Sequence, residues 1–318
     1  MSNPAPTYRS FSFGVTRGVR TERGGNVYLQ AEQALAPYPE RLTDRLQHWA
    51  QTAPQRTWMA RRDAAGAWQK ISYGEAWDRA QRIGQSLLNR GLSVERPVAI
   101  LSENSLEHAL LAIGAMTVGV PYCSVSTAYS LMSQDFEKLR HVLNTITPGL
   151  VYASDWARYG KAIDAAVTPG TEVAINSIAF YACKTPAICQ FDSLIQTEIT
   201  PAVAAATQAT GPDTIVKFLF TSGSTKLPKG VINTQRMLCA NQQQMAQSMP
   251  ALLDEPPVLV DWLPWNHTFG GNHNFGLTIF HGGTLYIDDG KPVPALVGET
   301  LRNLRDIAHA LIDWAPKE

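Results

Sequence analysis

The sequence predicts an α/β fold with largely parallel sheets flanked by helices. Short apolar segments of strand length alternate with segments of helical periodicity, and helix start and stop signals separate them. Of the 318 residues, 45% are hydrophobic, which is enough for a sizeable core. Charged residues make up 17%, below the usual ~25%, and this composition argues against a disordered chain. The length suggests two domains or one large one.

The first regular elements are predicted after an irregular, surface-wrapping lead over residues 1–40. Apolar residues at helical spacing predict a helix over 42–53, which the following proline ends. A short strand over 58–60, a turn at 64–66 and a return strand over 68–71 predict a hairpin.

Two helices follow, each with its own start signal. Ser72 and Glu75 have the spacing of a capping box, so a helix is expected from there to Gly91. A strand is predicted over 98–101, and Asn104 is expected to open the next helix.

The alternation continues to the end of the regular pattern. A helix is predicted over 136–147, a strand over 150–153, a linker or surface loop over 196–213 and a strand over 215–220. The remaining expected elements are a helix after Thr234, a strand over 258–262, a helix after Gly271 and a strand over 284–287.

The composition also excludes some classes of protein. Lys plus Arg and Asp plus Glu both number 27, so no basic field is present to hold a nucleic acid. The N-terminus lacks an apolar run of signal-peptide length, and no stretch approaches the ~20 apolar residues of a membrane span. No cysteine pair has C-x-x-C spacing, which predicts free thiols in a reducing compartment and a cytoplasmic protein. The cysteines are Cys123, Cys183, Cys189 and Cys239.

The most informative stretch runs from Lys217 to Val231. An apolar strand leads into four hydroxyl side chains, a glycine and two lysines, a set that suits a polyphosphate through N–H, hydroxyl and ammonium donors. The alternative is a Ser/Thr-rich surface turn. Neither a Walker A loop nor a G-x-S-x-G motif is present. The candidate phosphate-binding residues are Thr221, Ser222, Gly223, Ser224, Thr225, Lys226, Lys229 and Gly230.

This stretch resembles the phosphate-binding signature of the adenylate-forming acyl- and aryl-CoA synthetases, in which Thr-Ser-Gly-Ser-Thr precedes Pro-Lys-Gly. Residues 71–77 and 98–121 are similar to the first two core motifs of that family. Residues 261–271, Asp-Trp-Leu-Pro-Trp-Asn-His-Thr-Phe-Gly-Gly, resemble its segment with a histidine beside the acyl pocket. With residues 233–237, this segment looks most like bacterial feruloyl-CoA synthases. The resemblance covers roughly residues 40–305.

The resemblance implies a two-step reaction. A carboxylate attacks the α-phosphate of ATP and gives an acyl-adenylate and pyrophosphate, and the thiol of coenzyme A then displaces AMP. ATP, Mg²⁺ and coenzyme A are the implied cofactors, and a small carboxylic acid, of phenylpropanoid type, is the implied partner. Thr221, Ser222, Ser224 and Thr225 are expected to hold the β- and γ-phosphates. Lys229 and His267 are the expected catalytic residues.

The acid-binding residues are expected around His267. Trp262, Trp265 and Phe269 are candidates for an aromatic wall, with Gly270 beside them; ordinary core packing is the alternative for these aromatics and for the histidine. His267, His273 and His281 are too loosely spaced for a zinc site.

The chain also departs from the family pattern. Lys226 stands where the family has glycine. The later adenine, ribose and Mg²⁺ motifs and the C-terminal domain with its lysine are not found before Glu318. The predicted division is an irregular lead (1–40), a partial adenylation domain (41–305) and a divergent tail of frameshifted or prematurely ended origin (306–318), with poor solubility expected.

Three hypotheses therefore stay open. The first is a feruloyl-CoA synthase-like ligase, incomplete for catalysis, and the second is a non-catalytic nucleotide- or pyrophosphate-binding remnant of one. The third is an unrelated phosphotransferase that would need an acidic metal-binding pair, for which Asp288 and Asp289 are the candidates. Nothing in the sequence indicates an oligomeric state.

Overall fold

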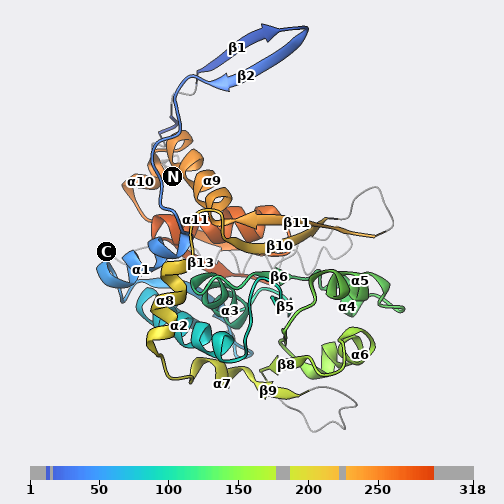
Figure 1. The fold of residues 1–318 in the computed structure, drawn as a ribbon. Coiled ribbons are helices and arrows are strands. Elements are labelled where there is room, and N and C mark those ends of the chain that lie inside the picture. Colours follow the sequence, from blue (N-terminus) through green and yellow to red (C-terminus); the bar gives the residue numbers. More distant parts are fainter. Residues whose placement is uncertain (1–11, 15–16, 177–186, 222–226, 290–318) are drawn as a thin grey trace, which may run out of the picture.

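The computed structural model describes residues 12–14, 17–176, 187–221 and 227–289. Three sheets are present in this part of the chain (Figure 1). A seven-stranded sheet contains, in spatial order, β11 (Lys229–Thr234), β10 (Ile215–Thr221), β6 (Tyr122–Ser124), β5 (Val98–Leu101), β7 (Leu150–Ala153), β8 (Glu172–Ile175) and β9 (Ile188–Gln190). A four-stranded sheet contains β12 (Val258–Asp261), β13 (Thr284–Ile287), β3 (Thr57–Arg62) and β4 (Trp68–Ser72). The third sheet is the hairpin of β1 (Gly18–Arg23) and β2 (Asn26–Ala31).

Helices connect and cover the two larger sheets. Their bounds are α1 (Leu42–Thr52), α2 (Tyr73–Asn89), α3 (Leu106–Thr117), α4 (Ala128–Leu131), α5 (Glu137–Ile146), α6 (Trp156–Ala166), α7 (Phe191–Ile195), α8 (Pro201–Ala209), α9 (Gln235–Ser248), α10 (Ala251–Asp254) and α11 (Phe275–His281), with a π-helix, η1 (Phe269–Asn274), before α11. In the seven-stranded sheet all pairs are parallel except β10–β11, and in the four-stranded sheet all are parallel except β3–β4. The predicted α/β class with largely parallel sheets is therefore confirmed.

Two hydrophobic clusters lie on opposite faces of the seven-stranded sheet. The larger joins α2 and α3 to side chains from both large sheets, such as Ile100 of β5 and Trp58 of β3. The smaller joins α5 and α6 to the other face, through residues such as Val151 and Ile163. Helices α2 and α3 thus separate the two sheets, as parallel strands buried on both faces require.

The helix start signals are confirmed in one case and wrong in the other. Ser72 and Glu75 form the predicted capping box at the start of α2. The N-cap of α3, however, is Ser105, whose hydroxyl accepts from the His108 N–H, and not Asn104. The Asn104 side chain instead forms hydrogen bonds with the backbone of Leu263 and Trp265.

Two further predictions are wrong. The lead was expected to be irregular over 1–40, but Gly24 and Gly25, both at positive φ, turn β1 into β2; two glycines favour such a two-residue hairpin turn. In Figure 1 this hairpin projects away from the rest of the chain. Residues 196–213 were expected to be a loop, but Thr200 caps helix α8, which begins at Pro201 and consists mainly of alanine.

The cysteines and the helices agree with a chain without disulfides or membrane spans in its described part. Cys123, Cys189 and Cys239 are free thiols, and Cys183 lies outside the described residues. Among the helices of the described segments, none is long and apolar enough to cross a membrane.

Close packing of α2 against α3 depends on glycine. A Cβ on Gly114 would lie 2.5 Å from Cγ2 of Ile83 and 3.2 Å from the carbonyl oxygen of Ala80. We expect Gly114→Val to lower the free energy of unfolding by about 2 kcal/mol, because the added methyl groups have no room. Gly211→Val is the matched control, since nothing lies within 4 Å of its Cβ position. Urea unfolding measures both, and equal midpoints for the two variants would contradict this packing.

Candidate functional site

Strand β10 carries the start of the candidate phosphate loop. Lys217 and Leu219 are buried, Thr221 is exposed at the end of the strand, and the period of two places these three side chains on one face. Strand β11 returns antiparallel and pairs Lys229 with Thr221. Since directly opposed residues share a face of the sheet, the Thr221 hydroxyl and the Lys229 ammonium lie on the same side where the loop leaves and re-enters the hairpin.

The predicted loop residues fall partly outside the described part of the chain. Ser222, Gly223, Ser224, Thr225 and Lys226 lie outside it. Gly230 pairs with Phe220, and a Cβ there would lie 3.3 Å from the phenyl ring, so a glycine lets this ring lie against β11.

The segment between β12 and η1 is held by a half-buried amide side chain that precedes another helix. The Asn104 side chain donates to the carbonyl oxygen of Leu263 (2.9 Å) and accepts from the N–H of Trp265 (3.1 Å). The carboxylate of Asp261, at the end of β12, accepts from the N–H of Leu263 (3.0 Å). The backbone before the candidate histidine is therefore fixed from two sides.

The π-helix η1 lies directly against this segment and against the β10–β11 hairpin. A Cβ on Gly270 would lie 2.5 Å from the carbonyl oxygen of Leu263, and one on Gly271 would collide with the carbonyl of Trp265, so only glycine permits the approach. On the hairpin side, the Asn272 side chain donates to Asn233 Oδ1 of β11 (2.8 Å). Gly270, predicted to bind substrate, thus has a clear role in backbone packing.

His267 and Phe269 are both exposed. The N–H of His267 donates to the carbonyl of Pro264 (3.1 Å), and the His267 carbonyl accepts from Gly271 (2.8 Å). The Phe269 side chain is 56% exposed and stacks on His273, with ring centroids 4.7 Å apart and an interplanar angle of 16°. Phe269 and His273 therefore present a flat aromatic surface to solvent.

Trp265 lies in the core instead. It is 4% exposed and makes edge-to-face contacts with His108 (4.9 Å) and Phe275 (5.1 Å). Trp262 is half-buried. The expected aromatic wall is thus divided, with Phe269 at the surface and Trp265 in the core.

Two ionisable groups are buried under η1. The Lys217 Nζ donates to the carbonyl of Gly271 (2.6 Å), and burial lowers the pKa of this ammonium to about 7. Burial also lowers the pKa of His108 to about 4, although its hydrogen bond with the Glu103 carbonyl acts in the opposite direction. The other ring nitrogen of His108 lies 2.8 Å from Ser124 Oγ. Burial therefore favours the neutral form of both groups.

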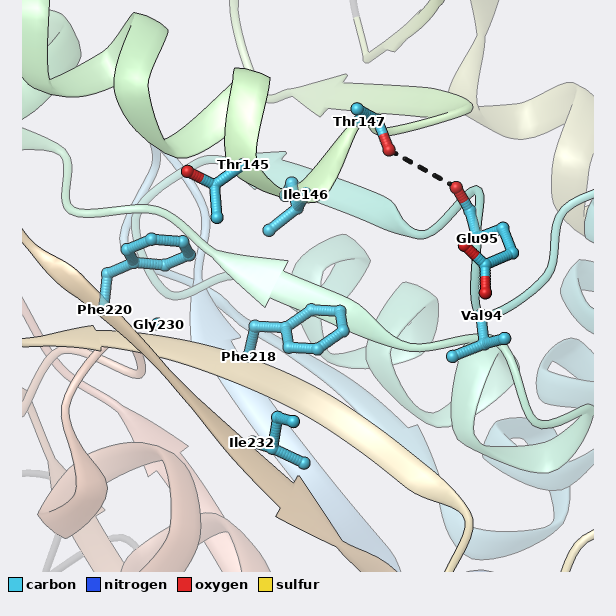
Figure 2. Close-up of a pocket in the computed structure, with 9 residues that line it drawn as sticks. All are labelled: Val94, Glu95, Thr145, Ile146, Thr147, Phe218, Phe220, Gly230 and Ile232. Atoms are coloured by element: carbon cyan, nitrogen blue, oxygen red, sulfur yellow. Dashed lines mark hydrogen bonds between the residues drawn. The ribbon is translucent and has the colours of Figure 1, made fainter.

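A pocket of about 300 Å³ lies on the other face of the hairpin (Figure 2). Its aromatic lining residues, Phe218 and Phe220, alternate with Lys217, Leu219 and Thr221 and so point the opposite way. The remaining lining residues are Val94, Glu95, Thr145, Ile146, Thr147, Gly230 and Ile232. This pocket is therefore separated by the sheet from the face that carries Thr221 and Lys229.

The described residues supply no metal-binding cluster: no group of three or more His, Cys, Asp or Glu side chains is gathered among them. Asp289 pairs with Arg61 (3.4 Å), and the N–H of Asp288 donates to the carbonyl of Asp261. What the site offers is a hydroxyl, an ammonium and exposed imidazole and phenyl groups. These groups suit the binding of anions and of a flat apolar group, not of a bare metal ion.

Sequence reasoning missed three residues that organise the site: Lys217, Asn104 and Gln242. Lys217 interrupts an otherwise apolar strand, which is the signal that was available for it, since a buried lysine is rare. Asn104 carried a signal that was read as a helix cap. Gln242 donates from α9 to the carbonyls of Asn272 (3.2 Å) and His273 (3.3 Å), and nothing local in the sequence marks it.

Comparisons with known proteins agree with the fold. The chain is 24% identical over 223 residues to the 3-[(3aS,4S,7aS)-7a-methyl-1,5-dioxo-octahydro-1H-inden-4-yl]propanoyl:CoA ligase of Rhodococcus jostii strain RHA1, covering 68% of this chain and 42% of that protein. It is 25% identical over 189 residues to malformin synthetase mlfA of Aspergillus niger, covering 59% of this chain and 3% of the synthetase. The chain thus spans less than half the length of these relatives.

A solved structure shows the same fold. The fatty acyl-adenylate ligase from L. pneumophila, in complex with acyl adenylate and pyrophosphate, superposes with a TM-score of 0.61 at 17% identity, covering 85% of this chain and 43% of that one. The family model for AMP-binding enzymes matches residues 46–308. The chain therefore belongs to the AMP-binding enzyme family, the adenylate-forming ligases.

Proposed function

We propose that this chain binds ATP and a carboxylic acid for acid–CoA ligation. In that reaction the carboxylate oxygen attacks the α-phosphorus of ATP, the bond to the β-phosphate oxygen breaks, and pyrophosphate leaves. The thiol of coenzyme A then attacks the acyl carbon and AMP leaves. The observation that carries the proposal is the placement of Thr221 and Lys229 side by side at the carboxyl end of β10, where open α/β sheets bind ligands.

The chemistry needs charge neutralisation more than acid–base groups, because the carboxylate and the triphosphate are both anionic. Lys229 supplies an exposed ammonium at the loop end. The proposed phosphate donors are the hydroxyls of Thr221 and the loop, and Gly223 leaves room for them. Mg²⁺ accompanies ATP in such reactions, and among the described residues no group of three or more His, Cys, Asp or Glu side chains gathers to hold a metal ion.

The proposed acid-binding side is the exposed part of η1 and the residues before it. His267 is exposed, and the ring of Phe269 stacks on that of His273. A planar phenylpropanoid acid such as ferulate suits this flat surface through offset stacking. Since ATP and coenzyme A are supplied in the cytoplasm, we place the reaction there.

The second candidate function is binding of a nucleotide or of pyrophosphate without catalysis. It is favoured by the described geometry, because the Thr221 hydroxyl and the Lys229 ammonium at the end of the β10–β11 hairpin are donors that suit a polyphosphate.

Exchange of labelled pyrophosphate into ATP by the purified chain separates the two candidates. We expect ferulate to stimulate the exchange and acetate and benzoate to stimulate it far less, because only ferulate has an extended planar group. No stimulation by any acid, with pyrophosphate still bound, would support the second candidate. Stimulation by acetate or benzoate but not by ferulate would contradict the phenylpropanoid substrate.

Lys229 is expected to contribute directly to polyphosphate binding. Lys229→Met should weaken binding of pyrophosphate by about tenfold, because one charge-assisted contact is lost. Isothermal titration calorimetry measures this change. Lys70→Met, at another exposed lysine, on β4, is the control and should leave the affinity unchanged. The same affinity in both variants would show that Lys229 does not contact the phosphates.

A further inference from the structure

Three carbonyl groups of the π-helix accept hydrogen bonds from side chains outside it. The Gly271 carbonyl accepts from Lys217 Nζ of β10, and the carbonyls of Asn272 and His273 accept from Gln242 Nε2 of α9. A π-helix leaves its backbone groups less well paired than an α-helix and is often found at functional sites. Side chains from two other elements therefore hold this turn in place.

A buried lysine is an energetically unfavourable donor for these hydrogen bonds. Lys217 is 1% exposed, and none of the ion pairs between described residues includes it. Its Nζ lies 5.6 Å from the centre of the Tyr122 ring. A buried ammonium without a carboxylate partner is strongly disfavoured, so a residue that served core packing alone would be apolar.

The position of Lys217 connects the two halves of the site. It lies on the same face of β10 as Thr221, about 13 Å along the strand from it at ~3.3 Å per residue. Directly opposite Lys217 on β11 is Asn233, which accepts from Asn272 of η1. The β10–β11 hairpin, which carries the proposed phosphate loop, therefore also forms hydrogen bonds with η1.

We propose that Lys217 is a positioning residue: from β10 it holds η1, and with it Phe269 and the preceding His267, in a fixed place relative to Thr221. The ligand of the segment with His267 and Phe269 rests on the proposed function. The hydrogen bond by which Lys217 holds η1 does not. Lys217 touches neither reactant and acts through the Gly271 carbonyl.

Hydrogen–deuterium exchange of the full chain tests the holding directly. In Lys217→Met, which keeps the length but cannot donate, we expect protection of the peptide 264–274 to fall by about tenfold. Protection of α2 and α3 should stay as in the wild type. Lys70→Met is the control and should change neither region. An unchanged 264–274 peptide, or an equal loss over the whole chain, would overturn the proposal.

The wild-type chain provides a second measurement that does not depend on the folding of a variant. In water the lysine pKa is about 10.4, so local opening that exposes Lys217 takes up a proton between pH 7 and 8.5. Rising pH then makes opening less favourable. After correction for the intrinsic exchange rate, protection of 264–274 should rise by about tenfold over this range.

The groups that face Lys217 do not produce such a rise. Burial lowers the pKa of His108 on α3 to about 4 and raises that of Tyr122 on β6, and the neighbouring Cys123 has its pKa raised to about 12. All three stay neutral in the folded chain over this range. A rise of the same size in α2 and α3 would overturn the proposal, because the opening that exposes Lys217 would then not be local to η1.

Acid-dependent pyrophosphate exchange adds the functional readout. Lys217→Met should raise the KM for the acid several-fold and leave the affinity for pyrophosphate unchanged, because Thr221 and Lys229 are not moved. An unchanged KM for the acid would overturn the positioning role. If the wild type shows no exchange, the proposed function fails, and the two protection measurements still decide whether Lys217 holds η1.

Discussion

The alternation of side chains along β10 is the constraint on which the arrangement of the site depends. Because the period of a strand is two, Lys217 and Thr221 must share one face, and Phe218 and Phe220 must take the other. One face meets η1 and leads to the candidate phosphate loop, and the other lines a pocket of mixed polarity beside the end of α5. A slip of one residue in the β10–β11 register would exchange the two faces.

The arrangement of the site also depends on the close approach of η1 to the backbone segment before it. Gly270 and Gly271 let η1 lie against the carbonyls of residues 263–265, and the Asn104 amide ties that same stretch to the start of α3. The exposed groups at 267 and 269 therefore stand on a backbone held by β10, β11, α3 and α9. Such a fixed backbone would serve the proposed reaction, because positioning lowers the barrier when two anions must be brought together.

Much of the fold could be predicted from local signals. The capping box at Ser72 and the strand over 284–287 were placed correctly because their signals are local: a cap three residues from its partner, and an apolar run bounded by Gly-Gly and Asp-Asp. Helix α8 was missed because the threonines, the prolines and the Gly-Pro-Asp in residues 196–213 are typical of loops, although the alanines favour a helix. The hairpin at 18–31 was missed because its strands bury no apolar face, so the usual alternation is absent.

The site was harder to predict, since its organisation depends on residues distant in sequence. Trp265 belongs to the core because His108 and Phe275, far apart in the chain, enclose it. The pairing of Thr221 with Lys229 follows from an antiparallel return that the loop alone does not specify. Lys217 is understood only once η1 lies over it, because its partner is a backbone carbonyl 54 residues away.

The central claim is that polyphosphate binds on the face of β10 that carries Lys217 and Thr221. A crystal structure of the chain with pyrophosphate tests it most directly. The account predicts a bound pyrophosphate at the end of the β10–β11 hairpin, in contact with Thr221 and Lys229 and on the same side as η1. Pyrophosphate bound in the pocket of Phe218 and Phe220, on the opposite face, would contradict it.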